Sequence, residues 1–319
     1  MSAETPPNYP EIKQEALWPQ ELLYWRRMGS REISDYLERT PPNKRLILIT
    51  WGVLEAHGPW LPVASDSMQA QVATDKVAMK LHQENGIQPI IFNSFADIGS
   101  YSATRDLPGA VAIEGWEEYE PGKDSPIVHM WNKVIERLNN EGFRKFFLVN
   151  GDGGNWMNYV ERPWMESFRS IIEDLKEKHG VQLAGANWDQ DGGEAWRHGG
   201  HHEHAFINWL CHYAPEFERF AALRAGLRPA SEEDLKTIDN VRTGFEDLTR
   251  EERRRSNWAT YPQQQNLRAV SEFSFQEYKN LLYEEDGITP KKEGGIGADF
   301  EAKIEKLMEK VLPLIKKSS

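Results

Sequence analysis

Four short apolar runs along the chain each end in polar or glycine-rich sequence. They cover residues 45–51, 88–93, 145–150 and 181–188. An apolar run of this length, bounded by turn residues, is typical of a strand that is buried on both faces of a sheet. We therefore expect four buried strands, with the polar residues that follow them lying in loops at their carboxyl ends.

Three further segments have the 3.6-residue periodicity of amphipathic helices. Their apolar positions are Ile127, Trp131, Val134 and Leu138 in the first, Val160, Trp164, Phe168, Ile171 and Leu175 in the second, and Phe300, Ile304, Leu307, Val311 and Leu314 in the third. Because helices alternate with strands, the pattern predicts an α/β fold with a mostly parallel central sheet. In such sheets a ligand binds beyond the carboxyl ends of the strands, where the polar clusters stand here.

The chain is predicted to form a single α/β domain over residues 44–319. Residues 1–43 are rich in Pro and Trp without a clear period, so we expect an extension that packs on the body. Residues from about 214 to 270 are dense in Arg and Glu, which indicates an inserted segment. A run such as residues 251–255 (EERRR) is more typical of a solvated face than of a binding patch.

Composition excludes several classes of partner. The 319 residues are 39% hydrophobic, enough for a core, and carry a formal net charge of -12. Because this charge repels phosphate backbones and anionic lipid surfaces, we expect neither a nucleic-acid nor a membrane partner. Cys211 is the single cysteine, so an internal disulfide is excluded, and the sequence has no apolar run of about 20 residues. We expect a cytoplasmic protein.

The first polar cluster contains Glu55, His57 and Asp66. Two residues apart on an extended segment, Glu55 and His57 project to the same side, and Asp66 follows a proline-stiffened turn. A mixed set of carboxylate and imidazole groups suits Zn, Mn or a similar divalent ion. Taken alone, these residues fit equally well as surface polar groups beside a turn.

A second cluster, residues 150–155 (NGDGGN), directly follows the third strand and contains Asp152. Its three glycines permit close approach of the backbone to a ligand, although an ordinary tight turn with a solvent-facing Asp152 has the same composition. The third cluster, residues 198–204, places Glu203 among four of the nine histidines, namely His198, His201, His202 and His204. Such a density of imidazoles indicates metal ligation or proton transfer by one or two of them.

With these residues the chain resembles the creatininase (creatinine amidohydrolase) family. The family motif E-x-H-G-P-x-L-P, followed by T-D, corresponds to residues 55–62 with Ser65 and Asp66. The N-G-H-G-G-N loop corresponds to residues 150–155, with Asp152 in place of histidine, and the H-A-G-x-x-E-T-S segment is similar to residues 198–205. Residues 107–110 and 295–299 are similar to two further motifs of the family. Ala103 and Thr104 stand where the family has a Glu-His pair.

The resemblance implies a three-layer α/β/α fold, often assembled as a homo-oligomer such as a hexamer, with one or two Zn or Mn ions per subunit. It assigns Asp66 as a bridging ligand, Glu55 and Asp152 to one metal, His57 and Glu203 to the other, and His198 as the catalytic histidine. His201 stands where many relatives have Glu, which suggests an exchange of ligand type with Asp152. Additional ligand or substrate contacts are expected among His201, His202, Trp188 and Trp196, although core packing is the alternative for the tryptophans.

The function that follows from this resemblance is a metal-dependent hydrolase that opens a small cyclic substrate. A metal-bound hydroxide would attack a carbonyl carbon, with the C–N bond of a cyclic amide favoured by family habit. One alternative is hydrolysis of a C–C bond in a cyclic diketone derived from inositol, of the 3-dehydro-inosose type. Another is a degenerate family member without catalysis, which the histidine-to-aspartate change at Asp152 favours.

Overall fold

The computed structural model describes residues 22–55, 57, 61–98, 126–152, 175–188, 196, 199–212, 231–233, 236 and 274–316. Five parallel strands form one sheet in the order β1-β3-β2-β4-β5. Their bounds are β1 Leu23–Tyr24, β2 Ile47–Trp51, β3 Ile90–Phe92, β4 Lys145–Asn150 and β5 Gln182–Asn187. The four predicted strands are confirmed, and β1 adds an edge strand from within the amino-terminal segment.

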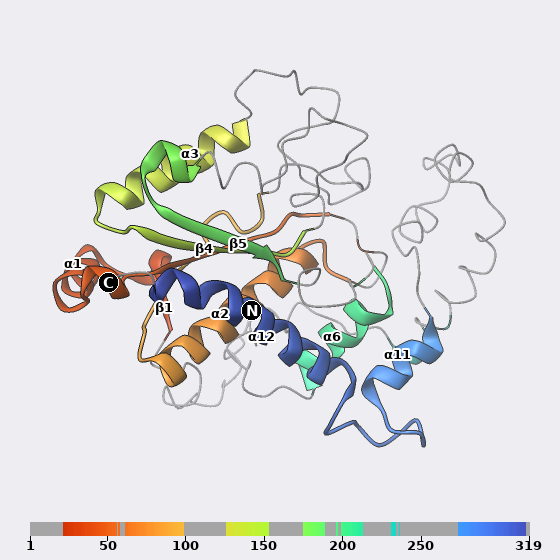
Figure 1. The fold of residues 1–319 in the computed structure, drawn as a ribbon. Coiled ribbons are helices and arrows are strands. Elements are labelled where there is room, and N and C mark those ends of the chain that lie inside the picture. The colour runs from red at the N-terminus through yellow and green to blue at the C-terminus, as the bar shows by residue number, and fades with distance from the viewer. Residues whose placement is uncertain are drawn as a thin grey trace, which may run out of the picture.

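Helices cover both faces of the sheet, which confirms the three-layer α/β/α architecture. Helix α3 (Pro126–Asn140) lies on one face, and α2 (Ser65–Asn85) and α12 (Gly295–Lys316) lie on the other (Figure 1). Short 3-10 turns at Trp25–Arg27 and Pro42–Lys44 flank α1 (Ser30–Arg39). Helices α6 (His201–His212) and α11 (Phe275–Leu282) pack beside α12. Among the described helices, none combines the length and apolar character needed to cross a bilayer.

Alternation along the central strands separates the two cores. In β2, Ile47, Ile49 and Trp51 face the core under α3, whereas Leu48 faces the core shared by α2 and α12. Such two-sided burial is what a parallel sheet between helical layers requires, and it explains the continuous apolar run. The helices predicted over 127–138 and 300–314 are confirmed, while the one predicted over 160–175 lies outside the described residues except for Leu175.

Helix α2 has no counterpart among the predicted helices, and its burial explains why. It lies against the sheet so closely that polar as well as apolar side chains are enclosed in its first half. Thr74 pairs with Thr50 of β2 at 3.0 Å, and the Gln71 amide donates to Asp75 at 3.0 Å. Because buried polar groups occupy its inner positions, the helix has no simple apolar stripe in its sequence.

Candidate metal centre

The predicted polar loops meet at the carboxyl-terminal edge of the sheet. β2 leads through Gly52 to Glu55 and His57, and the first turn of α2 carries Asp66 next to this loop. A Cβ on Gly52 would lie only 2.6 Å from the Ser67 nitrogen, so glycine is what allows the helix to approach this closely. The loop conformation is also fixed by a hydrogen bond from the Glu55 nitrogen to the Val63 carbonyl at 2.8 Å.

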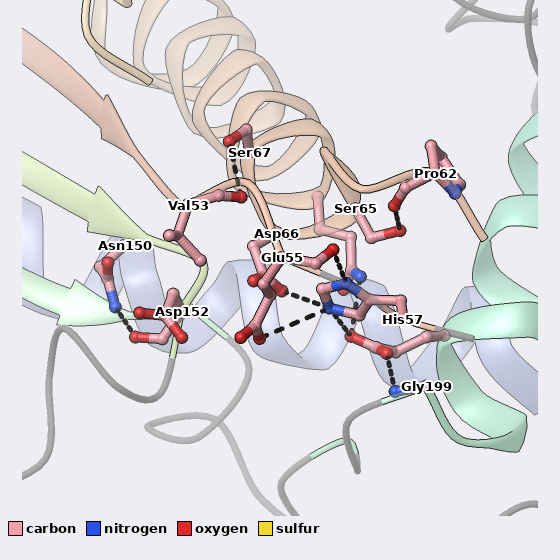
Figure 2. A network of polar contacts seen from close by, with 12 residues as sticks. Val53, Glu55, His57, Pro62, Ser65, Asp66, Ser67, Asn150, Asp152 and Gly199 are labelled. Carbon is pink, nitrogen blue, oxygen red and sulfur yellow. Dashed lines mark hydrogen bonds and ion pairs between the residues drawn. The ribbon is translucent and has the colours of Figure 1, made fainter. Parts of the chain in front are cut away.

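The fully buried imidazole of His57 stands among three carboxylates (Figure 2). Its Nε2 lies 3.0 Å from Asp66 Oδ1, 3.9 Å from Glu55 Oε1 and 3.8 Å from Glu203 Oε1. Its Nδ1 lies 3.1 Å from the Glu55 carbonyl oxygen, which can only accept, so Nδ1 carries a hydrogen. The backbone therefore orients the ring with Nε2 directed at the carboxylates.

Glu55, His57 and Asp66 form a donor set that fits a divalent metal. One ligand atom from each lies within 4.8 Å of the others, and all three residues are buried. Asp66 Oδ2 is buried and accepts no hydrogen bond from any described residue. A carboxylate oxygen without a donor is costly in a protein interior, and a cation would satisfy it. Two carboxylates and an imidazole match the preferences of Zn and Mn.

The electrostatics of the centre also favour a cation. Burial raises the pKa of Asp66 to about 7, with Glu55 and Glu203 acting in the same direction and His57 opposing them. Burial lowers the pKa of His57, but attraction to Asp66 and Glu203 outweighs it and leaves the value well above 6.5. Burial is the main cause for Asp66, and the neighbouring carboxylates are the cause for His57, so both shifts favour protons at the centre. A divalent cation would replace those protons.

Glu203, in the first turn of α6, lies next to His57 at the centre. Its Oε2 accepts a hydrogen bond from the Gly199 nitrogen at 2.6 Å, and its Oε1 accepts one from Gln69 Nε2 at 3.0 Å. Both carboxylate oxygens are thereby oriented. Gln69 is absent from the predicted site residues, and the signal that could reveal it is its spacing of three from Asp66 on one helix.

Asp152 follows β4 and is 5% exposed, so the alternative of a solvent-facing turn residue is excluded. Asn150 Nδ2 donates to the Asp152 carbonyl at 2.5 Å, which fixes the loop. Figure 2 shows Asp152 on the side of Asp66 that is away from His57. Among the described residues, the compact donor group contains neither Asp152 nor Glu203, although Glu203 Oε1 lies 3.8 Å from His57 Nε2.

The histidine-rich segment divides into several environments. His198 lies outside the described residues. His201 Nδ1 lies 3.4 Å from Glu277 Oε2 of α11, and the His201 ring centroid is 4.3 Å from that of His202. Burial, together with repulsion from His57 and His201, lowers the pKa of His204 to about 3, so that this buried imidazole is neutral. His204 belongs to the predicted histidine cluster, but the sequence assigns it no individual role.

Trp188 and Trp196 pack within the core between the sheet and α12. Their rings make an edge contact with centroids 4.7 Å apart, and Trp188 is also 5.8 Å from the Phe300 ring. Trp196 Nε1 donates to Asp299 Oδ2 at 2.6 Å, and its ring lies under the Lys303 ammonium at 5.7 Å. In this arrangement both tryptophans pack against α12.

Comparison with known proteins identifies the family. The family profile named Creatininase, described as creatinine amidohydrolase, matches residues 27–251. The chain belongs to the creatininase family. A curated relative in this comparison, 3-dehydro-scyllo-inosose hydrolase from Thermotoga maritima, is 26% identical over 207 residues, 61% of this chain and 57% of the relative. The chain therefore matches less than two thirds of that relative's length.

Solved creatininases share the fold. A creatininase point mutant complexed with creatine superposes with a TM-score of 0.51 at 11% identity, over 92% of this chain and 99% of that one. A manganese creatininase has a TM-score of 0.49 at 11% identity, over 90% and 96% of the two chains. The profile match confirms the predicted family, and the sheet with its flanking helices, together with the first of these superpositions, confirms the predicted fold class.

Proposed function

We propose that this creatininase-family chain is a metal-dependent hydrolase that opens a small ring by adding water to a ring carbonyl carbon. The observation that carries the proposal is the 3.0 Å approach of His57 Nε2 to Asp66 Oδ1 within a buried set of acidic groups. Membership of a family whose profile is described as an amidohydrolase supports hydrolysis as the reaction type.

Glu55, His57 and Asp66 would hold one divalent ion, Zn or Mn. Asp152 lies on the side of Asp66 away from His57, and Glu203 Oε1 lies 3.8 Å from His57 Nε2, so these two carboxylates would complete the site or hold a second ion. When bound, such an ion makes water a better nucleophile near neutral pH and polarises the carbonyl under attack. Burial of all five residues, each at most 5% exposed, would keep bulk water away from the reacting atoms.

The chain's own groups would prepare the reaction and move its protons. The Glu55 carbonyl holds the His57 ring, and Gln69 and the Gly199 nitrogen hold Glu203, so the centre is oriented before substrate arrives. We propose that His198 delivers a proton to the leaving atom. That atom is nitrogen if a cyclic amide opens, and carbon, leaving as a stabilised enolate, if a cyclic diketone opens.

Between these two bond types, the relative from Thermotoga maritima favours C–C hydrolysis. It is 26% identical to this chain over 207 residues, and it is named for a ring ketone derived from inositol. We therefore propose a polyhydroxylated cyclic diketone as the substrate class. This reverses the preference for a cyclic amide that the resemblance to the family gave. A cyclic amide is the second candidate, supported by the family description.

The proposal is tested by assaying the metal-loaded protein against both substrate types. Protein stripped with chelator and reloaded with Mn or Zn is incubated with 3-dehydro-scyllo-inosose and, separately, with creatinine. We expect a ring-opened carboxylate from the diketone, and loss of both turnover and bound metal in Asp66→Ala. Turnover of creatinine alone would support the second candidate. Protein that binds metal and opens neither ring would contradict hydrolysis and favour a non-catalytic family member.

A further inference from the structure

A glutamine that belongs to none of the predicted site residues lies against the candidate metal centre. Gln69 is 2% exposed and sits one helical turn after Asp66 on α2. Its Nε2 donates to Glu203 Oε1 at 3.0 Å across 134 residues of sequence. Burying a primary amide costs free energy unless it is hydrogen-bonded, and here the partner is a carboxylate of the centre itself.

Gln69 holds the particular oxygen of Glu203 that faces the centre. Glu203 Oε1, which accepts from Gln69, is also the atom that lies 3.8 Å from His57 Nε2. The other oxygen, Oε2, is held separately by the Gly199 nitrogen at 2.6 Å. A glutamate side chain has several rotamers, so two donors on its two oxygens select one of them.

A neutral amide side chain suits position 69 better than a charged side chain would. The surrounding carboxylates already raise the pKa of Asp66, so a further acid at position 69 would add to their repulsion. A lysine or arginine would neutralise Glu203 and compete with a metal ion for it. A neutral donor orients the carboxylate and leaves its charge available to a cation.

We propose that Gln69 is a positioning residue that sets the metal affinity of the centre by fixing the orientation of Glu203. This inference rests on the metal centre of the proposed function. Asp66 and Gln69 occupy positions i and i+3 of α2, so one turn of helix supplies a ligand and aligns a second ligand that comes from α6. The hydrogen bond between Gln69 and Glu203 in this way links the metal site to the relative position of α2 and α6.

The test compares metal affinity in Gln69→Met and Gln69→Asn with a matched control, Gln71→Met. Methionine has similar length without the donor, and asparagine keeps the amide but is too short to reach Glu203. Gln71 lies on the same helix, is 8% exposed and donates to Asp75 at 3.0 Å instead of to the centre. Dissociation constants for Zn and Mn are measured on metal-stripped protein by competition with a chromogenic chelator, and urea unfolding of the same samples reports stability.

We expect both Gln69 variants to bind metal about 10–100-fold more weakly, the usual effect of removing a partner of a metal ligand. Gln71→Met should lose stability while keeping the affinity of the wild type. Wild-type affinity in both Gln69 variants would overturn the inference, as would equal weakening in Gln71→Met, which would trace the effect to loosening of α2. A wild-type protein that binds neither ion would overturn the metal centre, and with it both the proposed function and this inference.

Discussion

Gly151 lies directly against the backbone of Asp66, at the junction of β4 and α2. A Cβ at position 151 would fall 2.2 Å from the Asp66 carbonyl oxygen and 3.0 Å from the Ala70 side chain. The Gly151 nitrogen also donates to the Trp51 carbonyl at 2.8 Å, which ties the ends of β4 and β2 together. The absence of a side chain at Gly151 therefore determines how closely the turn that carries Asp66 approaches the sheet.

Gly151→Ala should displace the first turn of α2, because the new methyl group cannot share space with a backbone oxygen. We expect a loss of about 1–3 kcal/mol in the free energy of unfolding, the usual cost of overpacking. Metal affinity should fall with it. Urea unfolding and chelator competition measure the two effects. Gly29→Ala is the control, since its Cβ would meet only Glu32 Oε2 at 3.5 Å. Unchanged stability and affinity in Gly151→Ala would contradict the close packing.

His198→Ala should separate proton transfer from metal binding. If His198 protonates the leaving atom, the variant retains its metal and turns over roughly 10²–10⁴-fold more slowly. Metal content by mass spectrometry and turnover on the accepted substrate are measured on the same preparation. A variant that loses its metal would show that His198 is a ligand. Unchanged turnover would exclude His198 as the proton donor.

In metal-free protein, stability should fall as the pH rises above 6.5. The pKa of His57 is raised well above 6.5, and that of Asp66 is raised from 3.8 to about 7, so the folded state keeps protons that the unfolded chain releases. The depressed pKa of His204, about 3, has the opposite effect, but only below 6.5, where the unfolded chain takes up a proton. Above pH 6.5 His57 therefore dominates, and Asp66 adds to the loss until it releases its proton near pH 7.

Saturating metal should stabilise the protein more at pH 8.5 than at pH 6.5, because a ligand must release its proton before it binds an ion. Thermal unfolding at both pH values, with chelator and with excess Mn, measures the difference. Equal stabilisation at the two pH values would show that Asp66 and His57 do not exchange protons for metal.

Asp299→Ala should destabilise the protein, because it removes the hydrogen-bond acceptor of the Trp196 indole. Asp299 accepts the hydrogen bond of the Trp196 indole at 2.6 Å, and the variant would leave that donor buried without the carboxylate. We expect a loss of about 1–3 kcal/mol in the free energy of unfolding, measured in urea. Asp286→Ala serves as the control, because Asp286 is exposed and bonds only within its own turn, to Ile288 and Thr289. A smaller loss for Asp299→Ala than for the control would contradict a supporting role for this contact.

The sequence predicted the sheet well because each central strand is buried on both faces and so consists almost entirely of apolar residues. It did not reveal α2, where the burial of Gln71, Thr74 and Asp75 interrupts the apolar periodicity on which the prediction depends. β1 also escaped prediction, because Leu23–Tyr24 is too short to show a period and is defined by its pairing with β3.

Of the candidate site, the sequence motif brought together Glu55, His57 and Asp66, which are close along the chain. Glu203 required the resemblance to a family, since its approach to His57 depends on how α6 packs. Gln69 was missed because its spacing of three from Asp66 is informative only on a helix, and the pattern did not predict α2. The orientation of the His57 ring likewise depends on a backbone carbonyl, which a sequence of side chains does not describe.

Anomalous X-ray diffraction from crystals grown with the metal that co-purifies with the protein tests the central claim most directly. Data collected on both sides of the Mn and Zn absorption edges would locate and identify each ion. The account predicts an anomalous peak within ligand distance of Glu55, His57 and Asp66, which Asp66→Ala crystals lack. Fully occupied metal elsewhere in the chain, with no peak among these three side chains, would contradict it.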